Sequence, residues 1–303
     1  MTFRPPGIAL LLSAMYLIVS LPGALAAIEV IDDEGRTVRL QHFAQRIVSL
    51  SPHITENLFA AGLGERIVAT VAHADYPEQA KDLPRIGGYN SLNLEALIQL
   101  RADLIITWGS GIRYDTQEKL NALGIPIYVS EPKKLHDIQK NIEDFAKLGG
   151  LIEREISALQ RFREALAVYP PQETFATVFY QIWNDPIQTL NGTHIVNDLF
   201  SRCGLDNAFS NAPSVAPTLN LESVITASPD LIIASGLGNE RPVWLQRWAR
   251  YGSISAVKNK ALHALNPDLM QRPTPRILEG LAQICTWSNQ LRASNPNAYS
   301  PSP

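Results

Sequence analysis

A fifteen-residue segment occurs twice in this chain, and its recurrence sets the strongest limit on the fold. LNLEALIQLRADLII at residues 92–106 returns as LNLESVITASPDLII at residues 219–233, with nine of the fifteen positions identical. Each copy has the pattern of a turn, a short helix and a strand. Solenoids repeat every roughly 20 to 50 residues. A single recurrence 127 residues later instead predicts two lobes of related build.

The rest of the pattern supports two α/β lobes. From Arg46 onward, short apolar strands such as IVSL, DLIITW and IPIYVS alternate with helical segments, and the alternation resumes after Pro171. Strands that alternate with helices are typical of parallel sheets covered by helices. We therefore expect an N-terminal lobe at 27–132 and a C-terminal lobe at 171–291.

Between the lobes, residues 133–170 have helical periodicity and no strand pattern, and Gly149-Gly150 interrupts them. This segment predicts a helical connector. Before the first lobe, IEVIDDEGRTVRL has the alternation of a hairpin that turns at Asp33-Glu34-Gly35. After the second lobe, residues 292–303 are polar and rich in Pro and Ser, so a disordered tail is expected.

The first 26 residues have the pattern of a secretory signal peptide. Arg4 is their one charge, an apolar run follows, and the segment ends in the small residues PGALAA before Ala27. An N-terminal membrane anchor is the alternative, but the apolar run is short and Pro22-Gly23 breaks it. Export is therefore expected. A formal charge of -3 provides no broad basic surface, which argues against a nucleic-acid partner.

The two cysteines, Cys203 and Cys285, both belong to the C-terminal lobe. In an oxidising compartment the simplest interpretation is one disulfide, and two buried free thiols are the alternative. Two cysteines alone are too few for a structural zinc site.

The sequence lacks several common catalytic motifs. The sequence contains no Gly-x-Ser-x-Gly elbow, no phosphate loop ending in Gly-Lys-Ser/Thr, and no His-Glu-x-x-His. The six histidines are scattered, so the sequence does not predict a dedicated metal site. An enzyme is therefore not expected.

The loops that follow the strands are the expected ligand side, because open parallel sheets bind ligands at their carboxyl ends. Only 8% of the residues are aromatic, yet these loops contain several aromatic side chains, a histidine and a methionine. Such side chains suit a large, rigid ligand held between two lobes, although any one of them could instead pack a loop onto a strand end. The set comprises His73, Tyr76, Tyr89, Trp108, Tyr114, Trp183 and Met270.

Several longer stretches resemble one family of transport proteins. RIVSLSPHITENLFAAGLGERIV, ADYP, IGGYNSLNLEALIQLRADLII and PRILEGLAQIC, with the leader and the helical connector, are similar to the periplasmic binding proteins that supply importers of metal chelates. The resemblance extends over about Arg46 to Leu291 and is strongest to the cobalamin-binding members. It implies a class III fold, in which two parallel-sheet lobes with flanking helices are joined by a long rigid helix.

The resemblance also implies a function. We expect a monomeric periplasmic protein that is not an enzyme, carries no cofactor, and delivers a corrinoid (cobalamin) from its inter-lobe cleft to the permease dimer of an ABC importer. Cys203 and Cys285 align with the family's disulfide pair. His73 stands where the cobalamin-binding member has a tyrosine, and Ala216 where it has a tryptophan, so two contacts differ. The residues expected to contact the ligand are His73, Tyr76, Tyr89, Trp108, Trp183, Met270 and Arg272.

Three alternatives remain at this point. The same clamp could hold haem, with His73 as an axial ligand, although a lone loop histidine is more often a hydrogen-bonding residue. It could hold an anionic ferric siderophore, for which Arg113, Arg241 and Arg272 are candidate contacts. An exported chelatase or hydrolase is the third alternative, and the missing catalytic motifs argue against it.

The repeat itself places one glutamate in each lobe, Glu95 and Glu222, in the first turn of the predicted helices. Asn93 and Asn220 are the expected N-caps, and Leu94, Leu97, Ile98, Leu221, Val224 and Ile225 are the expected buried stripes. Both glutamates should be exposed. Either glutamate could instead only stabilise its own helix, because a negative charge in the first turn interacts favourably with the helix dipole. By the resemblance, the pair is expected to dock onto a two-fold permease.

Overall fold

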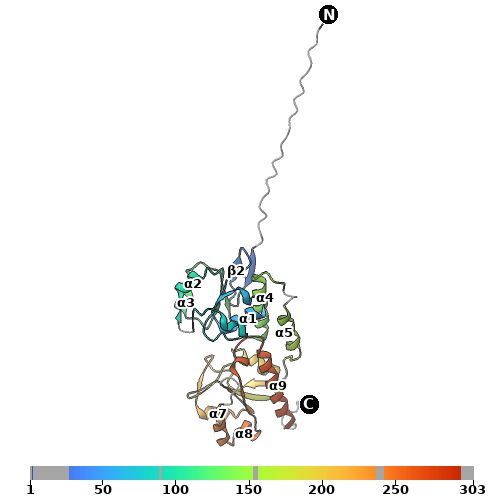
Figure 1. Ribbon diagram of the computed structural model, residues 1–303. Coiled ribbons are helices and arrows are strands. Elements are labelled where there is room, and N and C mark those ends of the chain that lie inside the picture. Colours follow the sequence, from blue (N-terminus) through green and yellow to red (C-terminus); the bar gives the residue numbers. More distant parts are fainter. Residues whose placement is uncertain (1, 3–26, 89–90, 153–155, 237–241, 295–303) are drawn as a thin grey trace.

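The computed structural model describes residues 27–88, 91–152, 156–236 and 242–294, together with Thr2. They form two lobes, one above the other in Figure 1, so the predicted α/β architecture is confirmed. The predicted signal peptide, apart from Thr2, lies outside the described residues. Within the described residues, no helix has both the length and the apolar character needed to cross a membrane.

Each lobe is built on a four-stranded parallel sheet, and the two sheets share one topology. The N-terminal sheet has the order β4-β3-β7-β8 and the C-terminal sheet the order β12-β9-β14-β15. In both, the first strand lies between the second and the third, and the fourth is at the edge. The predicted relation between the lobes is therefore confirmed. The strands are β3 (Ile47–Ser49), β4 (Ile67–Ala69), β7 (Leu104–Trp108), β8 (Ile127–Ser130), β9 (Ala176–Gln181), β12 (Leu205–Asn207), β14 (Leu231–Ser235) and β15 (Leu262–Leu265).

Helices and short strands complete the lobes. The α-helices are α1 (Pro52–Ala60), α2 (Leu94–Gln99), α3 (Tyr114–Asn121), α4 (Leu135–Leu148), α5 (Ser157–Ala167), α6 (Val196–Arg202), α7 (Leu221–Ala227), α8 (Ser255–Lys258) and α9 (Ile277–Ser294). The 3-10 segments are η1 (Gly64–Arg66), η2 (Glu78–Asp82), η4 (Val243–Arg250) and η5 (Pro267–Leu269). Short antiparallel pairings involve β5 (Gly87–Gly88), β6 (Ser91–Leu92), β10 (Trp183–Asn184), β11 (Ile187–Gln188) and β13 (Thr218–Leu219).

The two copies of the repeat form the same structure, α2 followed by β7 and α7 followed by β14. Asn93 accepts a hydrogen bond from the Ala96 amide at 2.9 Å, and Asn220 accepts one from the Ser223 amide at 2.7 Å, so both predicted caps are confirmed. Glu95 and Glu222 are exposed, as expected. One prediction was wrong: Ile98 is 57% exposed, because this short helix turns only Leu97 fully inward.

The predicted N-terminal hairpin is present as β1 (Ile28–Ile31) and β2 (Thr37–Leu40), paired antiparallel. Gly35 closes its turn at a φ of 79°, in the left-handed region that favours glycine. The Asp33 carboxylate accepts a hydrogen bond from the Glu131 amide at 2.8 Å, so the turn is fixed to the end of β8 in the N-terminal lobe.

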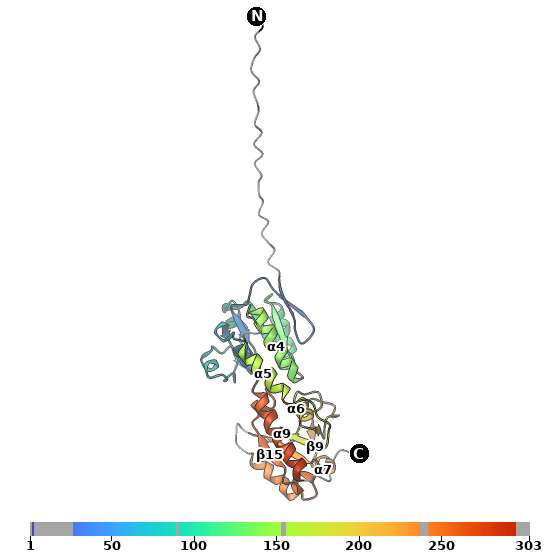
Figure 2. The same cartoon turned by 90° about the vertical axis from the view of Figure 1, so that its right-hand side faces the viewer.

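The connector consists of two helices packed on each other, α4 and α5, rather than one uninterrupted helix. The interruption falls at Gly149-Gly150 as predicted. Gly150 has a φ of 71°, and a side chain there would meet the Phe43 ring at 2.5 Å, so the helix ends where the chain turns. From that turn α5 leads back toward α9 and the second lobe (Figure 2).

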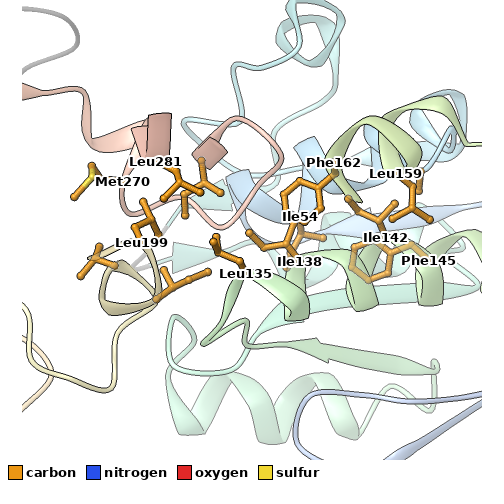
Figure 3. Close-up of a cluster of buried hydrophobic side chains, with 14 of the residues drawn as sticks. Ile54, Leu135, Ile138, Ile142, Phe145, Leu159, Phe162, Leu199, Met270 and Leu281 are labelled. Carbon is orange, nitrogen blue, oxygen red and sulfur yellow. The ribbon is translucent and has the colours of Figure 1, made fainter. Parts of the chain in front are cut away.

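The hydrophobic core continues from one lobe into the other. Figure 3 shows Leu199, Met270 and Leu281 of the C-terminal lobe beside Leu135 and Ile138 at the start of α4. Separating the lobes widely would expose this shared apolar surface to water, which disfavours a large opening. The predicted rigid joint between the lobes therefore has a physical basis in this core.

The predicted disulfide is confirmed. Cys203, at the end of α6, is bonded to Cys285 on α9, across 82 residues of sequence. The predicted start of the tail was wrong, because α9 continues to Ser294 and the Arg292 guanidinium stacks on the Phe175 ring at 3.9 Å. The rest of the tail, residues 295–303, lies outside the described residues.

Candidate functional site

Both lobes are hollowed at the carboxyl ends of their central strands. In the N-terminal lobe a hollow of about 250 Å³ follows β3, β4 and β7, and in the C-terminal lobe a hollow of about 610 Å³ follows β9, β14 and β15. This is the edge at which parallel sheets bind ligands. The first and third strands of both sheets thus contribute to a hollow, together with the second strand in the N-terminal lobe and the fourth in the C-terminal lobe.

The N-terminal hollow combines an indole and aliphatic side chains with hydrogen-bonding groups. Trp108, at the end of β7, is 36% exposed and forms part of the wall. His73 lines the same hollow with an exposed side chain and a left-handed backbone, at a φ of 65°. Both residues therefore lie where the sequence placed them, and their contact with a ligand stays a prediction. The hollow is also lined by Leu50, Ser51, Ile112, Arg113 and Thr116.

A buried histidine, which the sequence analysis did not single out, supports Trp108 from below. His53 meets the Trp108 ring edge-on, with the centroids 5.7 Å apart. Its Nδ1 lies 2.8 Å from the Ser51 hydroxyl and its Nε2 lies 3.1 Å from the Ser130 hydroxyl. Burial, with a smaller contribution from the charge of Arg272, lowers the pKa of His53 to about 3. The ring is therefore neutral at neutral pH.

The hydrogen-bond network fixes which nitrogen of His53 carries the proton. The Asn141 amide nitrogen donates to Asp33, so its oxygen must accept the proton of the Ser130 hydroxyl. Ser130 can then only accept from His53, which places the proton on Nε2 and leaves Nδ1 to accept from Ser51. The only indication of His53 in the sequence was the segment Ser51-Pro52-His53, which directly follows a predicted strand.

The loop that carries Trp108 is held from its other side by Glu131. One Glu131 oxygen accepts from the Ser110 amide at 2.6 Å and the other accepts from the Ser110 hydroxyl at 2.9 Å. Gly111 lies against the indole, where an added side-chain carbon would be 1.9 Å from the Trp108 ring. Trp108 is thus a preorganised wall, and only glycine fits beside it.

The C-terminal hollow is more aromatic. Trp183, on β10, is 59% exposed and lines it, and its contact with a ligand stays a prediction. Val243 and Trp244, at the start of η4, line it too, although they were not among the predicted ligand residues. Their place shortly after a strand, next to Pro242, was the available signal. Beneath the hollow, burial raises the pKa of Tyr180 to about 12, and its neutral hydroxyl accepts from Gln271 at 2.8 Å.

Ion pairs join the two lobes beside the hollows. Glu56 on α1 accepts two hydrogen bonds from Arg276 of the C-terminal lobe, at 2.8 and 2.7 Å. Arg272 reaches back to Asp75 of the N-terminal lobe at 3.1 Å and also pairs with Asp268 at 3.0 Å. Burial opposes ionisation of Asp75, but the hydrogen bond and the charge of Arg272 outweigh it and lower the pKa of that carboxyl.

The remaining predicted ligand residues fall in three places. Tyr76 and Arg272 lie at the lobe junction, where the Arg276 guanidinium stacks on the Tyr76 ring at 3.9 Å and Tyr76 lines a separate hollow beside Glu56. Their contact with a ligand stays a prediction. Met270 was wrongly placed in the cleft, because its side chain is fully buried in the shared core. Tyr89 and Arg241 lie outside the described residues.

Replacing Glu56 by alanine is expected to destabilise the protein by about 3 to 5 kcal/mol. The Glu56 side chain is only 4% exposed, and its loss leaves the mostly buried Arg276 guanidinium without its bidentate partner. Denaturant unfolding of the variant measures the change. The matched control is Glu78→Ala, which breaks a pair with Lys81 on the surface and should leave the unfolding midpoint unchanged. Equal midpoints for the two variants contradict a role for the pair in joining the lobes.

The described residues contain no group of three or more His, Cys, Asp or Glu side chains arranged to hold a metal ion. The features of the site are a hollow with Trp108 in the N-terminal lobe, a hollow with Trp183 and Trp244 in the C-terminal lobe, and a junction of ion pairs.

The chain belongs to the periplasmic binding proteins, whose family model matches residues 47–269. This membership confirms the predicted periplasmic location and confirms that the chain is a binding protein rather than an enzyme. Among curated relatives, the vitamin B12-binding protein of Vibrio campbellii is 37% identical over 255 residues, which cover 82% of this chain and 91% of that protein. The vitamin B12-binding protein of Vibrio cholerae is 36% identical over 247 residues, covering 80% and 89%.

Solved structures agree in fold. The crystal structure of the periplasmic vitamin B12-binding protein of Vibrio cholerae superposes with a TM-score of 0.70 at 35% identity, covering 82% of this chain and 98% of that one. A periplasmic heme-binding protein from Roseiflexus sp. RS-1 superposes with a TM-score of 0.68 at 24% identity, covering 82% and 99%, and shows the fold alone. The predicted class III fold is confirmed.

Proposed function

We propose that this protein binds a corrinoid, cobalamin, between its two lobes and delivers it to the permease of an ABC importer. The observation that carries the proposal is the pair of hollows at the carboxyl ends of the sheets of two related lobes, with Trp108 in one and Trp183 in the other. Large planar ligands bind to such walls through their flat faces, and polar groups at the rim fix their orientation. The similarity to vitamin B12-binding proteins supports the same cargo.

The charges of the site favour a corrinoid over an anionic siderophore. Of the three arginines considered for an anionic ligand, the two within the described residues are both paired. Arg113 pairs with Asp115 at 3.0 Å, and Arg272 pairs with Asp75 and Asp268. An anionic chelate would have to compete with these carboxylates, whereas the amide groups around a corrin ring need only hydrogen-bonding partners such as Ser51 and Thr116.

Delivery is proposed to use Glu95 and Glu222. Each is exposed in the first turn of a helix held by an asparagine cap, and the two helices occupy equivalent places in the two lobes. Two separated negative charges on a pseudo-symmetric surface suit a permease built from two identical subunits, each offering basic side chains. One monomer of this protein would then dock across the permease dimer.

The binding proposal is tested by calorimetric titration with cyanocobalamin. The native protein should bind it, and Trp108→Ala should weaken binding by at least about 1 kcal/mol, since aromatic contacts contribute roughly that much beyond area burial. Phe43→Ala is the control, because Phe43 is an exposed aromatic of the same lobe outside the hollow. Unchanged affinity in Trp108→Ala assigns that indole to packing and removes it from the site.

A further inference from the structure

The turn of the N-terminal hairpin is bonded to the edge of the N-terminal sheet. The hairpin strand β1 packs against α4 (Figure 1). The Asp33 amide donates to the Val129 carbonyl at 3.0 Å, and the Asp32 carboxylate accepts from the Val129 amide at 3.2 Å. These bonds hold the turn against β8, the edge strand of the sheet. The described residues that line the N-terminal hollow include none from the hairpin, so any effect of the hairpin on a ligand is indirect.

The Asp33 carboxylate joins two branches of hydrogen bonds. Its side chain is only 7% exposed. The Oδ2 atom accepts from the Glu131 amide and from the Asn141 side-chain nitrogen, both at 2.8 Å. The Oδ1 atom accepts from the Lys140 ammonium at 3.0 Å. One nearly buried carboxylate of the hairpin therefore serves donors from α4 and from the residue that follows β8.

The first branch leads from Asp33 to the underside of Trp108. The Asn141 oxygen accepts from the Ser130 hydroxyl, and that hydroxyl accepts from His53 Nε2 at 3.1 Å. The His53 ring then meets the Trp108 ring edge-on, with 5.7 Å between the centroids. Ser130 is also the residue of β8 that pairs with Trp108 of β7. The branch thus continues without a gap from the hairpin to the indole.

The second branch leads from Asp33 to the loop that carries Trp108. The Glu131 amide is bonded to Asp33, and the Glu131 carboxylate accepts from the Ser110 amide and hydroxyl at 2.6 and 2.9 Å. Ser110 is two residues beyond Trp108. Both supports of the indole therefore depend on the same carboxylate.

We infer that Asp33 is a positioning residue for the ligand wall: it fixes the Trp108 indole through both branches and thereby sets the affinity for the ligand without touching it. Loss of its oxygens leaves the Glu131 amide and the Asn141 amide group without their acceptor, and buried donors rearrange to find another. A wall that is no longer fixed must be ordered when the ligand binds, which lowers affinity. The effect on affinity rests on the proposed function, whereas the effect on the indole does not.

The position of the indole can be measured without a ligand. In protein labelled with fluorotryptophan, Trp108→Phe identifies the Trp108 signal in the fluorine NMR spectrum. Asp33→Ala should shift or broaden that signal, whereas Asp33→Asn, which retains an oxygen for both Oδ2 bonds, should leave it in place. Glu29→Ala is the matched control, because this acidic residue of the same hairpin pairs only with Arg39 on the surface among its described contacts. An unchanged Trp108 signal in Asp33→Ala overturns the inference.

The effect on affinity is measured by calorimetric titration with cyanocobalamin. Asp33→Ala should weaken binding by up to about fivefold, which is the factor for one aromatic contact, and Asp33→Asn should restore most of the loss. In the Trp108→Ala background, Asp33→Ala should cause no further loss, because Asp33 acts through the indole. A general loss of stability would instead weaken binding equally in both backgrounds, and that result overturns the inference. Native affinity in Asp33→Ala overturns it too.

Asn141→Ala guards against a failure of Asp33→Ala to fold. It interrupts the first branch and leaves the bond between Asp33 and the Glu131 amide in place. It should move the Trp108 signal in the same direction by a smaller amount, and an unmoved signal counts against the inference. If the native protein does not bind cyanocobalamin, the proposed function fails, while the fluorine spectra still decide whether Asp33 positions the indole.

Discussion

Cells in which both Glu95 and Glu222 are replaced by arginine are expected to lose corrinoid uptake completely, although the purified variant still binds its ligand. The two side chains are exposed on helices of different lobes, and neither is among the residues that line the hollows. Reversing their charges places like charges opposite the basic side chains proposed on the permease, and such juxtapositions cost several kcal/mol. Growth dependent on exogenous cobalamin measures uptake, and calorimetry measures ligand affinity.

The control must match the change in net charge. Glu164 on α5 and Glu279 on α9 are also exposed glutamates on helices, one in the connector and one in the C-terminal lobe. Their double replacement by arginine should leave uptake at the native level. Single replacements of Glu95 or Glu222 should give intermediate uptake, because one contact remains. Native uptake by the Glu95 and Glu222 double variant, at matched expression, rules out docking through these residues.

Removing the disulfide is expected to lower the free energy of unfolding by up to about 4.5 kcal/mol. The bond closes a loop across 82 residues, and the chain-entropy model assigns roughly that amount to a loop of this length. The loss is a large fraction of the stability of an ordinary domain, typically about 5 to 15 kcal/mol. Denaturant unfolding of Cys203→Ala with Cys285→Ala, compared with the oxidised native protein, measures it.

Reduction of the native protein with a thiol provides a second route to the same state and should lower the unfolding midpoint toward that of the double variant. Both cysteines are buried, so alanine avoids introducing an unpaired hydroxyl. A double variant as stable as the oxidised native protein contradicts a stabilising role for the bond.

Local patterns were sufficient to predict the parts of the fold that depend on neighbouring residues. The repeat predicted two related lobes because each copy contains a capping asparagine, a short amphipathic helix and a strand. Gly35 and Gly149-Gly150 marked the turn and the end of α4, since glycine adopts backbone conformations that other residues avoid. Caps and turns are specified within a few residues, so the sequence was enough.

Contacts between distant segments could not be predicted in this way. Glu56 and Arg276 are 220 residues apart, and nothing near either residue indicates that they form the ion pair between the lobes. Met270 illustrates the opposite error, because a methionine in a ligand-side loop turned inward to fill the shared core. The prediction that Ile98 is buried was wrong for a similar reason. Helical spacing gives the direction of a side chain but not the extent of the surface that covers it.

The sequence predicted where the candidate site lies but only some of the residues that form it. Trp108, His73 and Trp183 line the hollows because strand ends can be recognised in the sequence and the ligand edge of a parallel sheet is known. His53, Val243 and Trp244 were missed. His53 is in a helix rather than a loop, and the other two begin a 3-10 segment that was not counted among the loops after the strands.

Retention of a coloured ligand tests the central claim most directly. The purified protein is incubated separately with cyanocobalamin, haemin and several ferric siderophores, desalted, and examined by absorbance spectroscopy. We predict that the cyanocobalamin spectrum elutes with the protein, while the siderophores pass into the small-molecule fraction. Retention of haemin or of a siderophore, with cyanocobalamin absent from the protein fraction, contradicts the assignment of this clamp to corrinoids.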